Sequence, residues 1–84
     1  MAAPLSRLAG AALAGVGLSH FVKPELFESM TVSAFPTNTQ QYIYVNGALE
    51  TAIGLAYATG RSKLATAGLL AYGGWLGANA AKNA

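Results

Sequence analysis

The sequence predicts an all-α membrane protein with three transmembrane helices and a short interfacial helix between the first and the second. The 84 residues are 54% hydrophobic and 10% charged, whereas a soluble domain carries roughly 25% charged residues. Three apolar stretches follow one another, each close to the length that crosses the hydrocarbon core of a bilayer. A chain this short has room for one domain, so residues 1–84 are expected to form a single transmembrane domain.

The first predicted span covers residues 5–22 and is bracketed by Arg7 and Lys23. A signal peptide is the alternative interpretation, because Arg7 resembles its basic start and residues 12–14 resemble a small-residue cleavage site. The apolar run before that site is only a few residues long. This shortness favours a membrane span.

The segment 24–36 is expected to be a helix that lies at the membrane surface. Pro24 suits the first position of a helix, and two glutamates occupy the favourable first turn. Three large apolar side chains fall on one side of such a helix: Leu26, Phe27 and Met30. An apolar side opposite acidic residues is typical of an interfacial helix.

The second and third predicted spans cover residues 42–59 and 64–81. Asn46 and Glu50 are the strongly polar members of the second span. A tight basic turn, residues 60–63, separates the two spans. The tyrosines and the tryptophan of these spans are interpreted as interfacial anchors or packing residues.

Small residues recur at spacings of four along all three spans and predict closely packed helices. They are Ala11 and Gly15 in the first span, Ala48, Ala52 and Ala56 in the second, and Gly73 and Gly77 in the third. Alanine and glycine are abundant here, so chance alone can produce such a register. Helix interfaces are favoured because lipid-facing positions usually carry Leu or Ile.

The distribution of basic residues predicts the orientation of the chain. Arg7, Arg61 and Lys63 fall on one side of the membrane, and Lys23 and Lys82 fall on the other. The side with more Lys and Arg is cytoplasmic in most membrane proteins. We therefore expect a multi-pass protein of the cell membrane with a cytoplasmic N-terminus.

Four polar side chains are expected to meet in the outer half of the membrane: His20, Asn46, Glu50 and Asn79. Glu50 lies about 12 Å inward from the start of its helix, at a rise of 1.5 Å per residue. An ionised carboxylate facing lipid at this depth costs on the order of 2 kcal/mol or more. Glu50 is therefore expected to be neutral, paired or turned into a protein interface.

Two interpretations of Glu50 stay open. It is either a carboxylate that handles protons or binds a ligand, or a structural hydrogen-bonding group for His20, Asn46 or a partner subunit. His20 lies three residues before Lys23, which favours an interfacial histidine over a metal or proton site. The cluster is thus a possible ligand or partner contact.

The composition excludes several classes of function. The chain has no cysteine, which excludes disulfides, iron–sulfur clusters and zinc–thiolate sites. Its single histidine cannot supply both axial ligands of a bis-histidine haem. The net charge of +2 comes from scattered residues, so no nucleic-acid partner is expected. We predict no catalytic residues, no metal, no cofactor and a protein that is not an enzyme.

Two stretches and a short ending resemble the DoxX-like family of small membrane proteins. They are residues 17–27 (GLSHFVKPELF), 46–55 (NGALETAIGL) and 77–79 (GAN). Members of this family typically have four helices and are linked to quinone-coupled oxidoreductases or to membrane complexes. The resemblance implies that His20, Glu50 and Asn79 occupy the polar positions of the family pattern. This chain would lack the fourth helix, which implies that a neighbouring protein supplies the missing surface.

These features predict a small accessory subunit of a larger membrane complex, such as a transporter or lipid importer, which it stabilises or regulates by helix packing. Its expected partners are larger integral membrane subunits and lipid. Two alternatives stay open. One is a DoxX-type subunit that assists a quinone-linked oxidoreductase, with Glu50 and His20 handling protons. The other is a self-associating, holin-like membrane protein.

Overall fold

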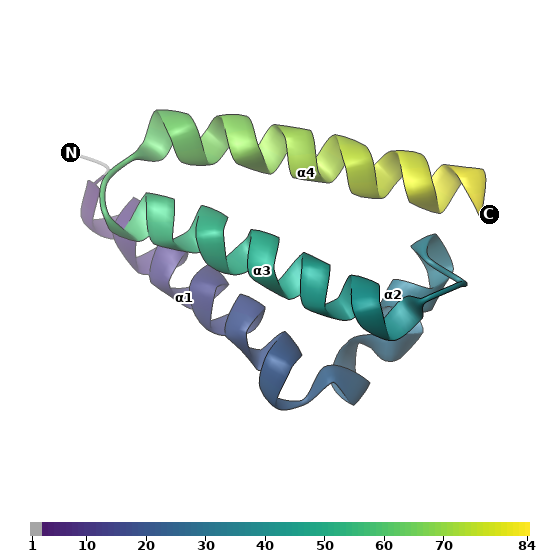
Figure 1. Ribbon diagram of the computed structural model, residues 1–84. Coiled ribbons are helices and arrows are strands. Elements are labelled where there is room, and N and C mark those ends of the chain that lie inside the picture. The colour runs from purple at the N-terminus through teal and green to yellow at the C-terminus, as the bar shows by residue number, and fades with distance from the viewer. Residues whose placement is uncertain (1–2) are drawn as a thin grey trace.

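The computed structural model describes residues 3–84, and the regular structure in this range is entirely helical (Figure 1). The elements are α1 (Ala3–Val22), the short 3-10 helix η1 (Pro24–Phe27), α2 (Glu28–Ala34), α3 (Thr39–Ala58) and α4 (Ser62–Lys82). Helices α1 and α3 pack side by side along most of their length, and α4 runs along another side of α3 (Figure 1). The molecule measures 42 × 26 × 14 Å, and a layer this thin can bury few side chains.

Local sequence signals explain where the helices begin and end. Pro24 has no N–H to continue α1, and it begins η1 instead. Gly60 ends α3 with a φ of +85°, a backbone conformation that glycine adopts without a steric penalty. Its N–H donates to the Tyr57 carbonyl at 3.0 Å, and that of Arg61 donates to the Ala56 carbonyl at 2.8 Å. These two bonds satisfy the last carbonyls of α3 and turn the chain into α4.

Two pairs of glycines set the contact between α1 and α3. A Cβ placed on Gly10 would lie 2.6 Å from the carbonyl oxygen of Gly54, and one on Gly17 would lie 2.7 Å from that of Gly47. The reciprocal distances are 2.6 and 2.8 Å. Each pair leaves no room for a side chain, so the two backbones touch directly.

The predicted small-residue stripes do not form this contact. Ala11, Gly15, Ala48 and Ala52 are exposed, Ala56 is half-buried, and a Cβ placed on Gly15, Gly73 or Gly77 would meet nothing within 4 Å. A spacing of four drifts by about 40° around a helix at each step, whereas a spacing of seven drifts by only about 20° in two turns. Gly10 and Gly17 are seven residues apart in α1, and Gly47 and Gly54 are seven apart in α3. The two glycines of each helix therefore stay on the face that meets the other helix.

The segment predicted as an interfacial helix forms η1 and α2 and closes one end of the α1–α3 pair (Figure 1). Leu26 and Met30 are exposed, but Phe27 stacks on the ring of His20 with 3.6 Å between the ring centroids. Thr31 and Ala34 are buried, and α2 contacts both α3 and α4. Much of the segment therefore packs on the bundle itself.

Helix α4 is attached through side-chain hydrogen bonds and through Trp75, whose ring centroid lies 5.0 Å from that of Phe35 and 6.2 Å from that of Tyr42. Ala65 is its one buried residue. The hydroxyls of Tyr57 and Thr66 lie 2.7 Å apart near the α3–α4 turn. At the opposite end of α4, the Asn83 side-chain amide donates to the Ala34 carbonyl at 2.9 Å. These few contacts hold α4 in place.

The prediction of three transmembrane helices is wrong. Among the helices of residues 3–84, only α1 contains a window long and apolar enough to cross a membrane, Leu5–Val22, with a mean hydropathy of 1.3 and 22% of it buried. Signal sequences and core helices of soluble proteins share this length and composition. Amides, Asn46 and Glu50 lower the hydropathy of α3, and glycines and polar residues lower that of α4. The same finding contradicts the predicted multi-pass arrangement.

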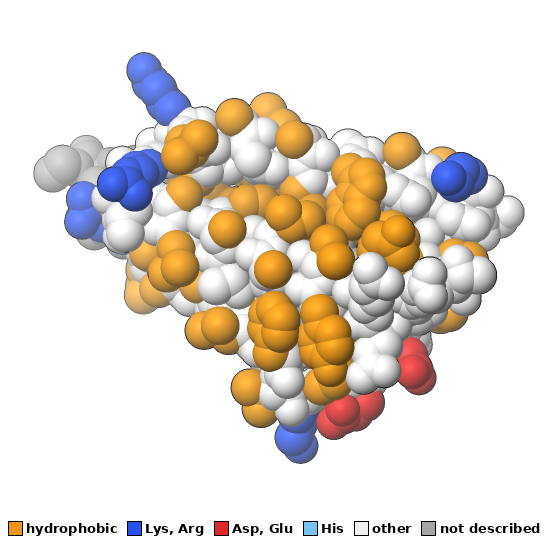
Figure 2. All heavy atoms as spheres, viewed as in Figure 1, with side chains coloured by type: hydrophobic (Ala, Val, Ile, Leu, Met, Phe, Trp, Pro, Cys, Tyr) orange, Lys and Arg blue, Asp and Glu red, His pale blue; other side chains and the backbone are white. Residues whose placement is uncertain are grey.

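The apolar core is small. The buried apolar residues are Ala14, Ala34, Phe35, Ile43, Ile53 and Ala65. Of these, Ile43 alone is a large side chain that is almost completely enclosed, at 2% exposure. Figure 2 shows many other apolar side chains spread over the outer surface, with Lys and Arg side chains towards the ends of the molecule. Most of the apolar side chains thus remain outside the core.

Candidate functional site

His20, near the end of α1, faces Glu50 in the middle of α3. The imidazole is 3% exposed, and its Nδ1 lies 2.9 Å from the carbonyl oxygen of Val16. Because a carbonyl only accepts hydrogen bonds, Nδ1 carries the hydrogen. The other ring nitrogen, Nε2, lies 3.5 Å from Glu50 Oε2. The two groups therefore form an ion pair whenever the imidazole is protonated.

The neighbours of His20 fix the position of its ring. Phe27 of η1 stacks on one face of the imidazole. Gly47 of α3 lies against its base, since a Cβ on Gly47 would come within 2.5 Å of the His20 Cβ. The glycine that brings α1 and α3 together therefore also makes room for the histidine.

Tyr72 of α4 reaches the same carboxylate from the opposite direction. Its hydroxyl donates to Asn46 Oδ1 at 3.0 Å and to Glu50 Oε2 at 3.1 Å, so one hydrogen is shared between two acceptors. Burial raises the pKa of the Tyr72 hydroxyl well above its usual range, and the charge of Glu50 and its hydrogen bond raise this pKa further. The hydroxyl therefore remains a donor at physiological pH.

Two polar atoms of this cluster remain available. Both contacts to Glu50 reach Oε2, and Tyr72 meets the oxygen of the Asn46 amide. Within residues 3–84, Glu50 Oε1 and Asn46 Nδ2 have no hydrogen-bond partner. In this part of the chain no buried side-chain nitrogen or oxygen lacks a partner, so both atoms are accessible to small molecules.

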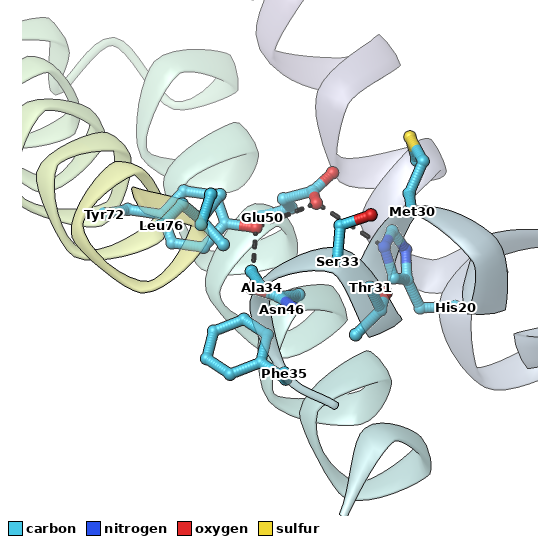
Figure 3. A pocket seen from close by; sticks show the side chains of 11 residues that line it. His20, Met30, Thr31, Ser33, Ala34, Phe35, Asn46, Glu50, Tyr72 and Leu76 are labelled. Carbon is cyan, nitrogen blue, oxygen red and sulfur yellow. Dashed lines mark hydrogen bonds and ion pairs between the residues drawn. The ribbon is translucent and has the colours of Figure 1, made fainter. Parts of the chain in front are cut away.

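The cluster forms one wall of a pocket of about 390 Å³ (Figure 3). Its polar lining residues are His20, Thr31, Ser33, Asn46, Glu50 and Tyr72. Its apolar lining residues are Met30, Ala34, Phe35, Leu76 and Ala80. The pocket thus lies where α1, α2, α3 and α4 approach one another.

The structure brings together His20, Asn46 and Glu50, but Asn79 stays apart. The Asn79 side-chain amide donates to the Trp75 carbonyl within α4 at 2.9 Å. Tyr72 takes the place expected for Asn79. A tyrosine inside a largely apolar helix usually needs a partner for its hydroxyl, and this signal could have identified Tyr72 from the sequence.

The geometry supports the binding of a polar group. One carboxylate, one imidazole and one phenol lie within hydrogen-bonding reach or close to it. In residues 3–84, three or more His, Asp or Glu side chains do not come together in a group that could hold a metal ion. The site can hold a polar group of a ligand.

Comparisons with known proteins give one match. A protein-family model described as "Domain of unknown function (DUF8561)" matches residues 8–80. No curated protein and no solved structure matches the chain. The matched range includes most of α1, all of α3 and the four clustered residues His20, Asn46, Glu50 and Tyr72.

Proposed function

The chain belongs to the DUF8561 family, whose description names no activity, and we propose that it is a small, non-catalytic accessory subunit of a larger membrane assembly, such as a transporter. It would stabilise or regulate that assembly by packing its exposed apolar helix surfaces against integral membrane subunits and lipid. Helix α1, which is long and apolar enough to cross a membrane, is the element that would hold it there.

The observation that carries this proposal is the apolar surface of the isolated chain. Large apolar side chains of α1, η1, α2, α3 and α4 are exposed, among them Leu5, Leu18, Leu26, Leu55 and Leu70. Burying one such side chain stabilises a complex by roughly 1.5–3 kcal/mol. Exposed apolar side chains on every helix of a small chain provide contact surface for protein partners or lipid. The surface is therefore suited to a partner or to lipid.

Purification in a mild detergent tests this proposal. We expect the tagged chain to elute with a larger membrane protein, which mass spectrometry then identifies. The variant Leu70→Gln changes a side chain that is 72% exposed on α4, and it should lower the recovered partner severalfold. Lys63→Gln, on the same helix, is the matched control and should retain it. A chain that elutes alone or as a simple homo-oligomer contradicts the proposal and favours the holin-like alternative.

The proposed orientation of α1 places its N-terminal end in the cytoplasm. Arg7 supports this orientation, because basic residues concentrate on the cytoplasmic side of membrane helices. Arg7 also packs against Gly60, which gathers it with Arg61 and Lys63 at one end of the molecule. A tag placed before residue 1 should resist protease added to intact cells and be cleaved after the cells are permeabilised. Cleavage in intact cells contradicts this orientation.

A second candidate function is that of a subunit assisting a quinone-linked oxidoreductase, with His20 and Glu50 handling protons. The specific observation in its favour is the contact of the His20 imidazole with the Glu50 carboxylate beside the pocket. The variant Glu50→Gln keeps the shape of the side chain but removes its acid–base function. Quinone-linked turnover should then be lost while the complex still assembles. Loss of assembly would instead indicate a structural role for Glu50.

A further inference from the structure

The pocket beside Glu50 has the size and lining of a small-molecule site. Its volume of about 390 Å³ falls within the range of roughly 300–1,000 Å³ that is usual for ligand pockets. Polar groups of α1, α3 and α4 line one part. Met30, Phe35, Leu76 and Ala80 supply an apolar part (Figure 3). A molecule with a small polar head and an apolar body matches this division.

The charges of the lining residues indicate an electrically neutral head. The groups that can carry a charge, His20 and Glu50, face each other with 3.5 Å between Nε2 and Oε2. No Lys or Arg of residues 3–84 lines the pocket. A carboxylate or phosphate head would therefore meet the Glu50 carboxylate with no Lys or Arg beside it, which is costly in a partly buried site. An ammonium head only donates hydrogen bonds, so it would leave the donor Asn46 Nδ2 without an acceptor.

The two available atoms define the polar chemistry further. Asn46 Nδ2 can donate a hydrogen bond, and Glu50 Oε1 can accept one. A ketone or ether oxygen only accepts, and it would leave Glu50 Oε1 without a partner. A hydroxyl group both donates and accepts, so its chemistry matches both of these atoms.

We propose that the pocket binds a neutral amphiphile whose hydroxyl head pairs with Asn46 Nδ2 and Glu50 Oε1 and whose apolar body lies against Phe35, Leu76 and Ala80. This ligand class is independent of the accessory role and of quinone chemistry, because the binding belongs to the chain itself. The hydroxyl accepts from the amide nitrogen and donates to the free carboxylate oxygen.

Trp75 is a built-in reporter for this site. It is the single tryptophan of the chain, and its ring centroid lies 5.0 Å from that of Phe35 and 6.2 Å from that of Tyr72. Both of these neighbours line the pocket. A bromine atom quenches tryptophan fluorescence at short range, so a brominated ligand in the pocket should quench Trp75.

The experiment uses the full chain in phosphatidylcholine nanodiscs, titrated with 10-bromodecan-1-ol. We expect saturable quenching of Trp75. The variant Ala80→Leu fills the pocket and should abolish the saturable part, whereas Ala81→Leu, one residue further along α4 and outside the lining, should leave it unchanged. Asn46→Leu removes the donor and should weaken binding by roughly three- to tenfold, the usual worth of one neutral hydrogen bond. Circular dichroism checks that each variant remains helical.

Two further probes test the head group. 1-Bromodecane and 10-bromodecanoate carry the same chain without a hydroxyl, and both should bind at least several times more weakly. Equal saturable quenching by either probe, or no effect of Ala80→Leu, overturns the proposal. A decyl-substituted benzoquinone that competes as well as its quinol also overturns the hydroxyl requirement. That result leaves the quinone-linked function standing, so the two ideas fail separately.

Discussion

Tyr72 joins two helices through a single hydroxyl hydrogen. The hydroxyl lies between Asn46 Oδ1 and Glu50 Oε2 of α3, and it is the main polar contact between the middle of α4 and the rest of the chain. A hydrogen bond to a charged acceptor contributes roughly 1.5–3 kcal/mol, about twice the contribution of a neutral one. The position of α4 therefore depends strongly on one atom.

Replacing Tyr72 by Phe should lower the free energy of unfolding by about 1–3 kcal/mol, because Glu50 loses its donor while the ring remains. Chemical denaturation followed by circular dichroism measures the change. Tyr44→Phe is the matched control, since the Tyr44 hydroxyl contacts only the exposed side chain of Gln40 at 3.3 Å. Equal effects of the two substitutions would show that the hydrogen bond from Tyr72 to Glu50 contributes nothing to the free energy of unfolding.

The same hydroxyl predicts a loss of stability in alkali. The pKa of Tyr72 is raised above its ordinary value of 10.0 in the folded chain. Above pH 10 the unfolded chain releases this proton while the folded chain keeps it, so the free energy of unfolding falls as the pH rises further. Below pH 10 this contribution is fully present. Denaturation at a series of pH values should show a decline that is shallower in the Tyr72→Phe variant; parallel declines would contradict it.

Helices α1 and α3 form the most closely packed pair of elements in the fold. Their glycine pairs bring backbone against backbone, with Thr51 and Ala14 filling the spaces between them. Alanine is usually preferred to glycine in a helix by roughly 0.5–1 kcal/mol. At the paired positions close packing reverses this preference, because a Cβ would overlap the facing backbone.

Two substitutions in α1 should therefore have opposite signs. Gly17→Ala places a Cβ against the backbone of Thr51 and the carbonyl of Gly47, and it should destabilise the chain by roughly 1–3 kcal/mol. Gly15→Ala meets nothing within 4 Å and should stabilise it by roughly 0.5–1 kcal/mol. Thermal unfolding of the two variants side by side measures both values. If Gly17→Ala instead raises the thermal stability, the backbone contact between α1 and α3 at this position is wrong.

The positions of the helices could be predicted from the sequence, because Pro24, Gly60 and the apolar runs mark their ends. The register between α1 and α3 could not be predicted, because alanines at spacings of four suggest an interface wherever alanine is abundant. The three spans were overpredicted for a related reason. Tyrosine counts as hydrophobic in the composition but, like glycine, adds nothing to the mean hydropathy of a helix, and Asn46 and Glu50 lower that of their own helix further.

The candidate site was predictable only in part. Polar residues within apolar helices identify His20, Asn46 and Glu50, and the structure places them together. Asn79 carries the same signal, but its amide is used within α4. Which polar side chain of α4 reaches Glu50 depends on the rotation of that helix. This rotation is decided by one buried residue, by the packing of Trp75 on Phe35 and by a few side-chain hydrogen bonds, and these leave little trace in the sequence.

At the scale of the whole molecule, stability is unevenly distributed. The α1–α3 pair contains most of the tight contacts, and α4 closes the pocket from one side with Ala65 as its one buried residue. Segments with few buried contacts open with a lower free energy than the rest of a fold. The pocket therefore has one firm wall and one that can move away.

Hydrogen exchange should reveal this difference. We expect the backbone amides of α4 to exchange well before those of α1 and α3, since α4 can detach without separating the glycine pairs. Mass spectrometry of peptides from residues 62–82 and 39–58 measures the two rates under one condition. Tyr72→Phe should speed exchange in α4 and leave α3 almost unchanged. Equal protection of both helices would show that the bundle opens as one unit.

The glycine pairing also restricts how the length of the chain can vary. The two residue numbers of each pair, 10 with 54 and 17 with 47, add up to 64, so both pairs share one antiparallel register. A residue inserted between Gly10 and Gly17 would rotate one glycine by about 100° away from its partner. Insertions in residues 23–38 or at the α3–α4 turn leave both pairs facing each other. Among family members, differences in length should therefore collect in these two connections and be absent from the paired stretches.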